Sequence, residues 1–365
     1  VPEVEKNNSN EKITGKGKKS VFIIALVAMF IFTIFSLMAS ITFGNADISL
    51  QEVYSVIGYE LFKMNQFAAY STGAVHDVVW LIRFPRVVLA LAVGMGLSIC
   101  GVVMQAIVQN PLADPYILGV SSGATLGATL AIILGIGTFF GGNFVGVMAF
   151  IGALVTSFAV MAIANMGGRA TAGKLILTGT AVSSVCSAFS NFIIYMQNDN
   201  NATSEVMHWT MGSLSGAEWG KVKVILPVIL ICTIIFWSQY RNLNLMLLGD
   251  EVSITLGTNL QKYRTIYLVI AAVMVGFAVY TAGMIGFVGL IIPHVVRILF
   301  GTDHRRLIPF SALLGGTFLI WSDVACRTIL KNAEIPIGIL VSLIGAPCFI
   351  YLLVNRSYGF GGGKS

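Results

Sequence analysis

The chain has 365 residues, of which 56% are hydrophobic and only 10% are charged, and its formal net charge is +6. Soluble globular proteins have roughly 25% charged residues, so the composition excludes a single soluble domain and favours a chain that crosses a membrane several times. The five cysteines lie in apolar runs without a CxxC pair, and the four histidines have no HExxH spacing. Neither pattern predicts a metal site or a disulfide framework.

Ten apolar runs approach the length that crosses a bilayer, which is about 20 residues for an α-helix. None of them alternates with a period of two, so membrane-spanning barrel strands are excluded and we predict an all-α, polytopic membrane protein. The first run is too long for a signal-peptide core and is predicted to be retained, and the short eighth run is predicted to be a partial or tilted helix. The predicted spans are 21–42, 84–108, 117–138, 144–165, 175–196, 222–239, 264–282, 286–300, 307–328 and 337–354.

Lysine and arginine are unevenly distributed between the two sides that this order of spans defines. With the N-terminus in the cytoplasm, ten spans place the C-terminus there too, and most of the 22 Lys and Arg residues then fall on the cytoplasmic side. This bias follows the positive-inside rule, so nucleic acid is not needed to explain the net charge. We predict a cytoplasmic N-terminal tail at 1–19, a ten-helix transmembrane domain at 20–356 and a cytoplasmic C-terminal tail at 357–365.

The second and third spans are separated by the stretch NPLADPYILGVSSGA, residues 110–124. Its two prolines break the helix and predict a turn on the cytoplasmic side. Gly119, Gly123 and Gly127 follow at the GxxxGxxxG spacing that lets membrane helices approach closely. Taken alone, this spacing predicts only ordinary helix packing.

Three long blocks of sequence, in order, carry a more specific pattern. They are RFPRVVLALAVGMGLSICGVVMQAIVQNPLADPYILGVSSGA, GMIGFVGLIIPHVVRILFGTDHRRLIPFSALLGG, and SDVACRTI followed by EIPIGILVSLIGAPCFIYLL. Together they closely resemble the FecCD-type permease family of ABC importers, which carries ferric siderophores, haem and cobalamin. The blocks extend from residue 83 to residue 353, so the resemblance covers nearly the whole chain after the first span.

The resemblance implies ten spans per subunit and a set of partners. These are two copies of a cytoplasmic ATPase subunit that bind ATP and magnesium, a second permease subunit that is identical or related, and a substrate-binding protein outside the membrane. It implies no cofactor or metal on this chain. The chain ends in GGGKS, but Tyr358 stands where a phosphate-binding loop GxxxxGK[ST] needs glycine,, so the ATP site must lie on another subunit.

The resemblance also assigns an inner gate at the cytoplasmic end of the transport path. By motif, Asn110 and Leu112 form one half of this gate, and Ala172 and Gly173, just before the fifth span, form the other. The family often has hydroxyl residues in the second half. Alanine and glycine offer no side-chain hydrogen bond, so this chain departs from the family there.

The cytoplasmic stretch LLGDEVSITLG, residues 247–257, has polar and apolar residues interleaved and is too short and polar to span. Such an amphipathic segment suits docking into a groove of a soluble partner. In the family, a segment like this one forms the coupling helices that contact the ATPase. The coupling residues predicted here are Leu248, Gly249, Asp250, Glu251, Leu256 and Gly257.

Three arginines stand at outer ends of spans, against the positive-inside bias: Arg83, Arg86 and Arg327. Arginine at a membrane surface can simply extend its head group into water. The family uses arginines at these positions to meet carboxylates of the binding protein, and the planar guanidinium suits such bidentate pairing. Asp323 lies four residues before Arg327, so the two can pair on one helix face.

Two spans are predicted to line the transport path, the fifth and the tenth. Gly179 and Ser183 in the fifth have the same spacing as Gly338 and Ser342 in the tenth. The two halves of the chain have opposite orientations in the predicted topology, as in transporters with inverted repeats. The family places both spans at the path.

We therefore predict the permease subunit of a bacterial ABC importer in the cytoplasmic membrane, not an enzyme. The breadth of the family ranks a ferric siderophore first as cargo, haem second and cobalamin third. An ion-coupled secondary transporter is the alternative class, but it usually needs carboxylates or histidines within its spans, and few ionisable residues occur there. A membrane-embedded enzyme is a third class, which no paired carboxylates or metal-ligand spacing within the spans supports.

Overall fold

The computed structural model describes residues 2–44, 46–166, 168, 171–197, 200–249, 253, 255, 260–331 and 333–355. Over these ranges every regular element is a helix and no strand occurs, which confirms the predicted all-α class. The first half comprises α1 (Pro2–Thr42), α2 (Leu50–Phe62), η1 (Asn65–Tyr70), α3 (Ala74–His76), η2 (Asp77–Arg83), α4 (Phe84–Val108), η3 (Pro115–Leu118), α5 (Val120–Leu134), η4 (Thr138–Asn143) and α6 (Phe144–Asn165). The second half comprises α7 (Ala172–Met196), α8 (Asn200–Thr210), α9 (Trp219–Ser238), α10 (Tyr240–Leu247), α12 (Gln261–Ala282), α13 (Val288–Phe300), α14 (His304–Thr328) and α15 (Ile337–Asn355).

Within the described part of the chain, seven helices are long and apolar enough to cross a membrane, and three further apolar helices are shorter. Each of the ten predicted spans falls on one of these helices. The structure is therefore that of a polytopic helical membrane protein, while the count of ten crossings stays a prediction. The long segments are Ser20–Thr42, Ala74–Val108, Thr138–Asn165, Ala172–Met196, Trp219–Ser238, Gln261–Ala282 and His304–Thr328, and the shorter ones are Val120–Leu134, Val288–Phe300 and Ile337–Tyr351.

The predicted third span, 117–138, is too long at both ends. Helix α5 covers only Val120–Leu134, because Gly119 (φ 73°) precedes it and Gly135 (φ 66°) caps its C-terminus. Both glycines have left-handed backbone conformations, which glycine adopts without steric cost and which end an α-helix.

The eighth predicted span corresponds to α13, a helix of 13 residues. At 1.5 Å per residue it is about 20 Å long, which is shorter than the roughly 30 Å of a bilayer core. The prediction of a partial helix at this place agrees with this length.

Helix α4 forms the centre of the bundle, and almost all of its residues are buried. It packs against α14, α9, α12 and α13. Glycines allow the closest of these approaches: a Cβ atom at Gly94 would collide with the carbonyl of Gly315, and one at Gly101 with the carbonyl of Gly289. Small residues thus let the backbones of α4, α13 and α14 come into direct contact, as is typical of helices in lipid.

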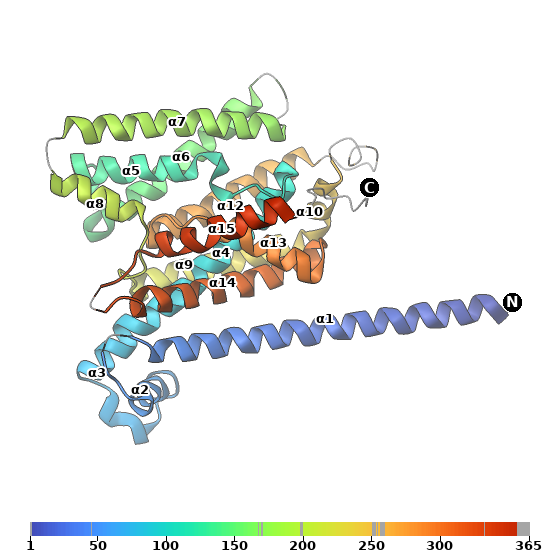
Figure 1. Ribbon diagram of the computed structural model, residues 1–365, viewed down its shortest axis with the longest axis horizontal. Helices are drawn as coiled ribbons and strands as arrows, with labels where there is room; N and C mark the ends of the chain where they lie inside the picture. The colour runs from blue at the N-terminus through green and yellow to red at the C-terminus, as the bar shows by residue number, and fades with distance from the viewer. Residues whose placement is uncertain are drawn as a thin grey trace.

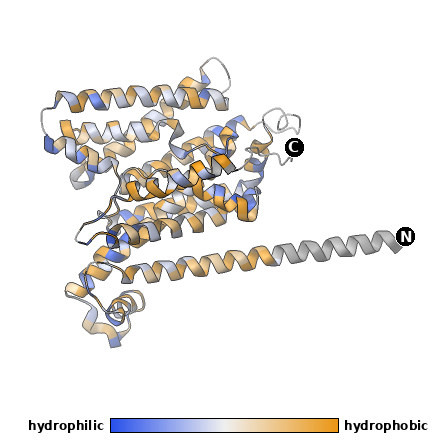
Figure 2. Cartoon of the chain, in the orientation of Figure 1, coloured by the Kyte–Doolittle hydropathy of each residue, from blue (hydrophilic) through white to orange (hydrophobic). Residues whose placement is uncertain are grey.

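The bundle has two flanks around this centre (Figure 1). Helices α5, α6, α7 and α8 form one flank, with α7 along its edge, and α1 runs along the opposite flank beside α14. Between α5 and α6, Gly123 packs on Thr156 and Gly127 on Met148, so the predicted close packing is confirmed for these two glycines. Figure 2 shows hydrophobic residues on the helices of both flanks, mixed with more polar residues on α7 and α8.

Candidate transport path and arginine cluster

The turn at 110–119 is held by its own polar side chains. Asn110 Oδ1 accepts a hydrogen bond from the Leu112 backbone N–H at 2.9 Å, and Asp114 Oδ1 accepts one from the Tyr116 N–H at 2.8 Å. Asparagine and aspartate favour such turns because their side chains can bond to backbone two residues ahead. Burial raises the pKa of Asp114 to about 6, although the hydrogen bond from the Tyr116 backbone lowers it.

Tyr116 connects this turn to the segment between α12 and α13. Its hydroxyl donates to the carbonyl of Ile285 at 3.2 Å and accepts from the N–H of the same residue at 3.3 Å. Pro115 lies against Gly289, where a Cβ atom would collide with the proline ring. The predicted gate turn is thus anchored to the start of α13.

The two halves of the predicted inner gate lie on different elements. Asn110 and Leu112 are half-buried in the turn, whereas Ala172 and Gly173 begin α7. A Cβ atom at Gly173 would meet no neighbouring atom within 4 Å. Thr171, one residue earlier, carries the hydroxyl group that the sequence lacks at 172 and 173, and accepts a hydrogen bond from the Lys174 N–H at 3.3 Å. The gate function of these residues stays a prediction.

The predicted coupling segment follows α10. Leu248 is 55% exposed, and Gly249 has a left-handed backbone with φ 93°. Ser253 is buried and donates a hydrogen bond to the carbonyl of Leu245 at 3.1 Å, which folds the segment back on α10. The other four predicted coupling residues, Asp250, Glu251, Leu256 and Gly257, lie outside the described residues.

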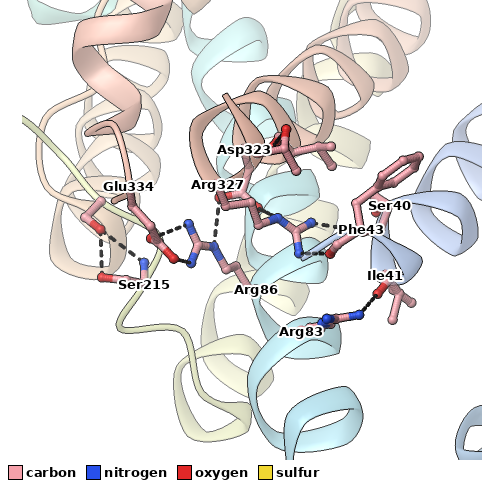
Figure 3. A network of polar contacts seen from close by, with 12 residues as sticks. Ser40, Ile41, Phe43, Arg83, Arg86, Ser215, Asp323, Arg327 and Glu334 are labelled. Carbon is pink, nitrogen blue, oxygen red and sulfur yellow. Dashed lines mark hydrogen bonds and ion pairs between the residues drawn. The ribbon is translucent and has the colours of Figure 1, made fainter. Parts of the chain in front are cut away.

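Arg83 and Arg327 lie at the end of the bundle where α1 terminates, and both cap that helix (Figure 3). Their guanidinium groups donate to backbone carbonyls at distances of 2.7–3.3 Å. A cation at a helix C-terminus satisfies orphan carbonyls and opposes the negative end of the helix dipole. Arg83 bonds to Ile41, Thr42 and Ala46, and Arg327 to Ser40 and Phe43.

Arg86 lies beside them and binds two carboxylates. Its Nε donates to Asp323 Oδ1 at 2.8 Å, and its two terminal nitrogens form a bidentate pair with Glu334 at 3.0 and 2.9 Å. Asp323 also pairs with Arg327 at 3.3 Å, which confirms the pairing predicted from their spacing. In Figure 3 the side chains of α4, α14 and the segment after α14 meet in this cluster.

The three arginines predicted to dock the binding protein are buried within this chain. Arg83, Arg86 and Arg327 are only 4%, 7% and 4% exposed. Each arginine uses its donors within the chain, because a buried guanidinium without partners costs several kcal/mol, about 3–5 for a broken buried pair. No motif or spacing in the sequence marks Glu334, the exposed member of the cluster. Docking of a partner through this cluster stays a prediction.

A cavity of about 580 Å³ lies between α5, α15 and the segments after α8 and α12. Gly338 and Ser342, predicted to line the path, are part of its wall. Gly179 and Ser183 lie elsewhere: they face Gly119, where a Cβ atom would be 3.5 Å from the Ser183 hydroxyl. Residues of the wall that sequence reasoning missed are Tyr116, Ser121, Met211 and Met284.

Gly338 is needed at its place because three segments meet there. A Cβ atom would collide with the carbonyl of Met211 and lie 2.8 Å from that of Met284. The Gly338 N–H donates to the Met211 carbonyl at 3.1 Å. Met284 also accepts a hydrogen bond from the Thr125 hydroxyl at 3.1 Å. No repeat spacing marks the two methionines, so the sequence could not have identified them as cavity residues.

The fold is thus a bundle of apolar helices with a cavity between α5 and α15. Residues 31–355 match the FecCD transport family, and the chain belongs to that family. It is 42% identical over 291 residues to the cobalamin import system permease protein BtuC of Halobacterium salinarum, with 80% of this chain and 76% of that protein covered. It is 38% identical over 283 residues to the hemin transport system permease protein HmuU of Yersinia pestis, with 76% and 84% covered.

A solved structure, the inward-facing conformation of a metal-chelate-type ABC transporter, has a similar fold. It is 30% identical, the TM-score is 0.75, and the match covers 91% of this chain and 99% of that one. The chain is therefore an ABC transporter permease, a multi-pass subunit of the cytoplasmic membrane and not an enzyme.

Proposed function

We propose that the chain is the permease of a bacterial importer that moves a chelated metal complex inward, with a ferric siderophore as the first candidate cargo and haem and cobalamin as the next. The chemistry of the cavity wall carries this proposal. It consists of Met211, Met284, Tyr116, two serines, one threonine and four glycine or aliphatic residues. A naked metal ion would need several carboxylate, imidazole or thiolate ligands, and no such group of three or more occurs among the described residues.

Such a wall suits a large organic complex that must bind weakly in order to leave. Thioethers are flexible and polarizable, so they adapt to differently shaped ligands, and isolated hydroxyls offer few fixed hydrogen bonds. A cavity of about 580 Å³ lies within the usual range for small-molecule sites, 300–1,000 Å³,. Cobalamin and haem are also large organic complexes that such a wall suits. A transport measurement must therefore identify the cargo.

We propose three kinds of protein partner. Two cytoplasmic ATPase subunits, which bind the ATP and magnesium, would dock at the exposed Leu248 and the segment that follows it. A second permease, identical or related, would cover part of the apolar face of α7, where Leu177, Phe192 and Tyr195 are 73%, 60% and 85% exposed. A substrate-binding protein would dock at the opposite side, near the arginine cluster.

We also propose the topology that these partners need: ten crossings at 20–356, short tails at 1–19 and 357–365 in the cytoplasm, and a weak inverted repeat. In Figure 1 the start of α1 and the end of α15 point to the same end of the bundle, which supports termini on one side. Under this topology the 110–119 turn faces the cytoplasm and the arginine cluster faces outward.

Transport by the reconstituted complex tests the proposal. The permease, purified with its ATPase and with the binding protein identified by pull-down and mass spectrometry, is placed in proteoliposomes containing ATP. We expect uptake of an iron-55 siderophore that stops without ATP and persists when an ionophore removes ion gradients. If the proteoliposomes take up haem or cobalamin but no ferric siderophore, that compound is the cargo instead. Uptake that needs an ion gradient and no ATP would overturn the ABC mechanism.

A further inference from the structure

Glu334 is the accessible carboxylate of the arginine cluster. It lies in the short segment between α14 and α15, and its side chain is 42% exposed. Asp323, the other carboxylate, has a side chain only 1% exposed and is shared by Arg86 and Arg327. Within this cluster, Glu334 can therefore leave its arginine for water, whereas the buried Asp323 cannot do so without leaving Arg327 with no carboxylate partner in the cluster.

The cluster carries an excess of positive charge. It contains the three guanidinium groups of Arg83, Arg86 and Arg327 and the two carboxylates of Asp323 and Glu334. Arg86 is bound by Asp323 through Nε, and its terminal nitrogens form the two-pronged edge that holds Glu334. A guanidinium edge of this kind matches any carboxylate, so another carboxylate can replace that of Glu334 with the same geometry.

The Glu334 segment leads directly to the cavity. The backbone N–H of its neighbour Ile335 donates a hydrogen bond to the Cys326 carbonyl at 3.0 Å. The N–H of Ile337 donates to the Gly212 carbonyl at 3.2 Å, and that of Gly338 to the Met211 carbonyl at 3.1 Å. Gly338 and Met211 are part of the cavity wall. Glu334 lies only four positions before Gly338, so a displacement of Glu334 acts on the start of α15.

We propose that Glu334 is a built-in substitute for a partner's carboxylate. It holds the Arg86 edge while the outer face is free, and an acidic residue of the docking binding protein replaces it. Once displaced, Glu334 no longer ties this segment to α4, and only the backbone bonds of Ile335, Ile337 and Gly338 then hold the start of α15 at the cavity. The inference rests on the proposed function, because it takes the soluble binding protein as the acidic partner.

The first experiment needs no partner. Phenylglyoxal modifies accessible guanidinium groups, and mass spectrometry of the peptide that contains Arg86 measures its rate in the purified transporter in nanodiscs. We expect Glu334→Ala to raise the rate of Arg86 modification about two- to fivefold, the range typical of one accessible charge pair. Glu218→Ala is the matched control, because Glu218 is a 57% exposed glutamate that pairs with Lys221. Equal Arg86 rates in both variants and the wild type would overturn the proposal.

The second experiment measures docking of the binding protein recovered by pull-down. Without its internal competitor, Glu334→Ala should bind that protein about two- to fivefold more tightly, and Glu218→Ala should bind as the wild type does. Glu334→Gln keeps the side-chain volume and serves if the alanine variant folds poorly. Unchanged or weaker docking in both Glu334 variants would overturn the proposal. If the wild type does not bind the protein at all, the proposed function fails instead, and the phenylglyoxal rates still decide whether Glu334 covers Arg86.

Discussion

At the scale of single residues, several buried or half-buried ionisable groups of this chain hold turns, helix ends and contacts between helices. Asp114 fixes the 110–119 turn, Arg83 and Arg327 cap α1, and Arg86 joins α4 to Asp323 on α14 and to Glu334. Removing any of these groups should lower the stability of the permease, because it leaves a polar partner without its hydrogen bond.

Asp114 makes the stability of the permease depend on pH. Its pKa in the folded chain is raised by burial from 3.8 to about 6, so the protonated form is favoured by folding. The stabilisation is fully present below pH 3.8 and is lost as the pH rises through 6. In detergent, lowering the pH from 7.5 to 5 should stabilise the wild type by about 1–2 kcal/mol relative to Asp114→Asn. Parallel melting temperatures of the two proteins across this range would contradict the assignment.

The arginine caps give a second prediction at the residue scale. Arg83→Ala should destabilise the permease by about 2–4 kcal/mol, because it leaves three carbonyls near the end of α1 without their donor,. Amide hydrogen exchange of residues 40–46 should accelerate in the same variant. Lys331→Ala, an exposed cation in the segment after α14, serves as the control and should leave both measurements unchanged.

At the scale of elements, the helices were largely predictable from the sequence, whereas the contacts between distant parts of the chain were not. The spans predicted at 222–239, 264–282 and 307–328 agree within about one turn with α9, α12 and α14, because an uninterrupted apolar run determines a membrane helix. The segment between α1 and α4 was missed, since α2, η1, α3 and η2 are short. The burial of Arg86 could not be predicted, because its carboxylate partners lie about 240 residues away and only the tertiary fold brings them together.

Glycine packing gives a prediction at this scale. Gly101→Ala should prevent α4 and α13 from approaching, because the added Cβ would collide with the Gly289 carbonyl. We expect a loss of at least about 1–3 kcal/mol, the usual cost of overpacking. Gly220→Ala in α9 is the matched control, since a Cβ there meets no atom within 4 Å and alanine favours a helix by up to about 1 kcal/mol. Melting temperatures of the purified proteins, lower for Gly101→Ala and unchanged or higher for Gly220→Ala, provide the measurement.

At the scale of the whole molecule, the two proposed ends of the path are mechanically connected through the cavity. Tyr116 joins the 110–119 turn to Ile285, the neighbour of Met284, and Met284 shares the cavity wall with Gly338. Glu334 lies four residues before Gly338. The 110–119 turn and the segment that holds Glu334 thus both contact the same wall.

In the proposed topology, coupling to the ATPase enters this connection at the cytoplasmic end, and we predict that Leu248 receives it. It is 55% exposed at the end of α10, beside Gly249, although leucine in water gains nothing from that position,. Leu248→Asp should therefore reduce uptake by proteoliposomes about tenfold or more, because a buried unpaired carboxylate in the ATPase contact costs more than about 1.4 kcal/mol. Insertion and melting temperature should not change. Leu61→Asp is the matched control: Leu61 is a 45% exposed leucine on α2, on the other side of the proposed membrane, and its variant should transport normally. Wild-type uptake and wild-type substrate-stimulated ATPase activity in Leu248→Asp would place the coupling contact elsewhere on the chain.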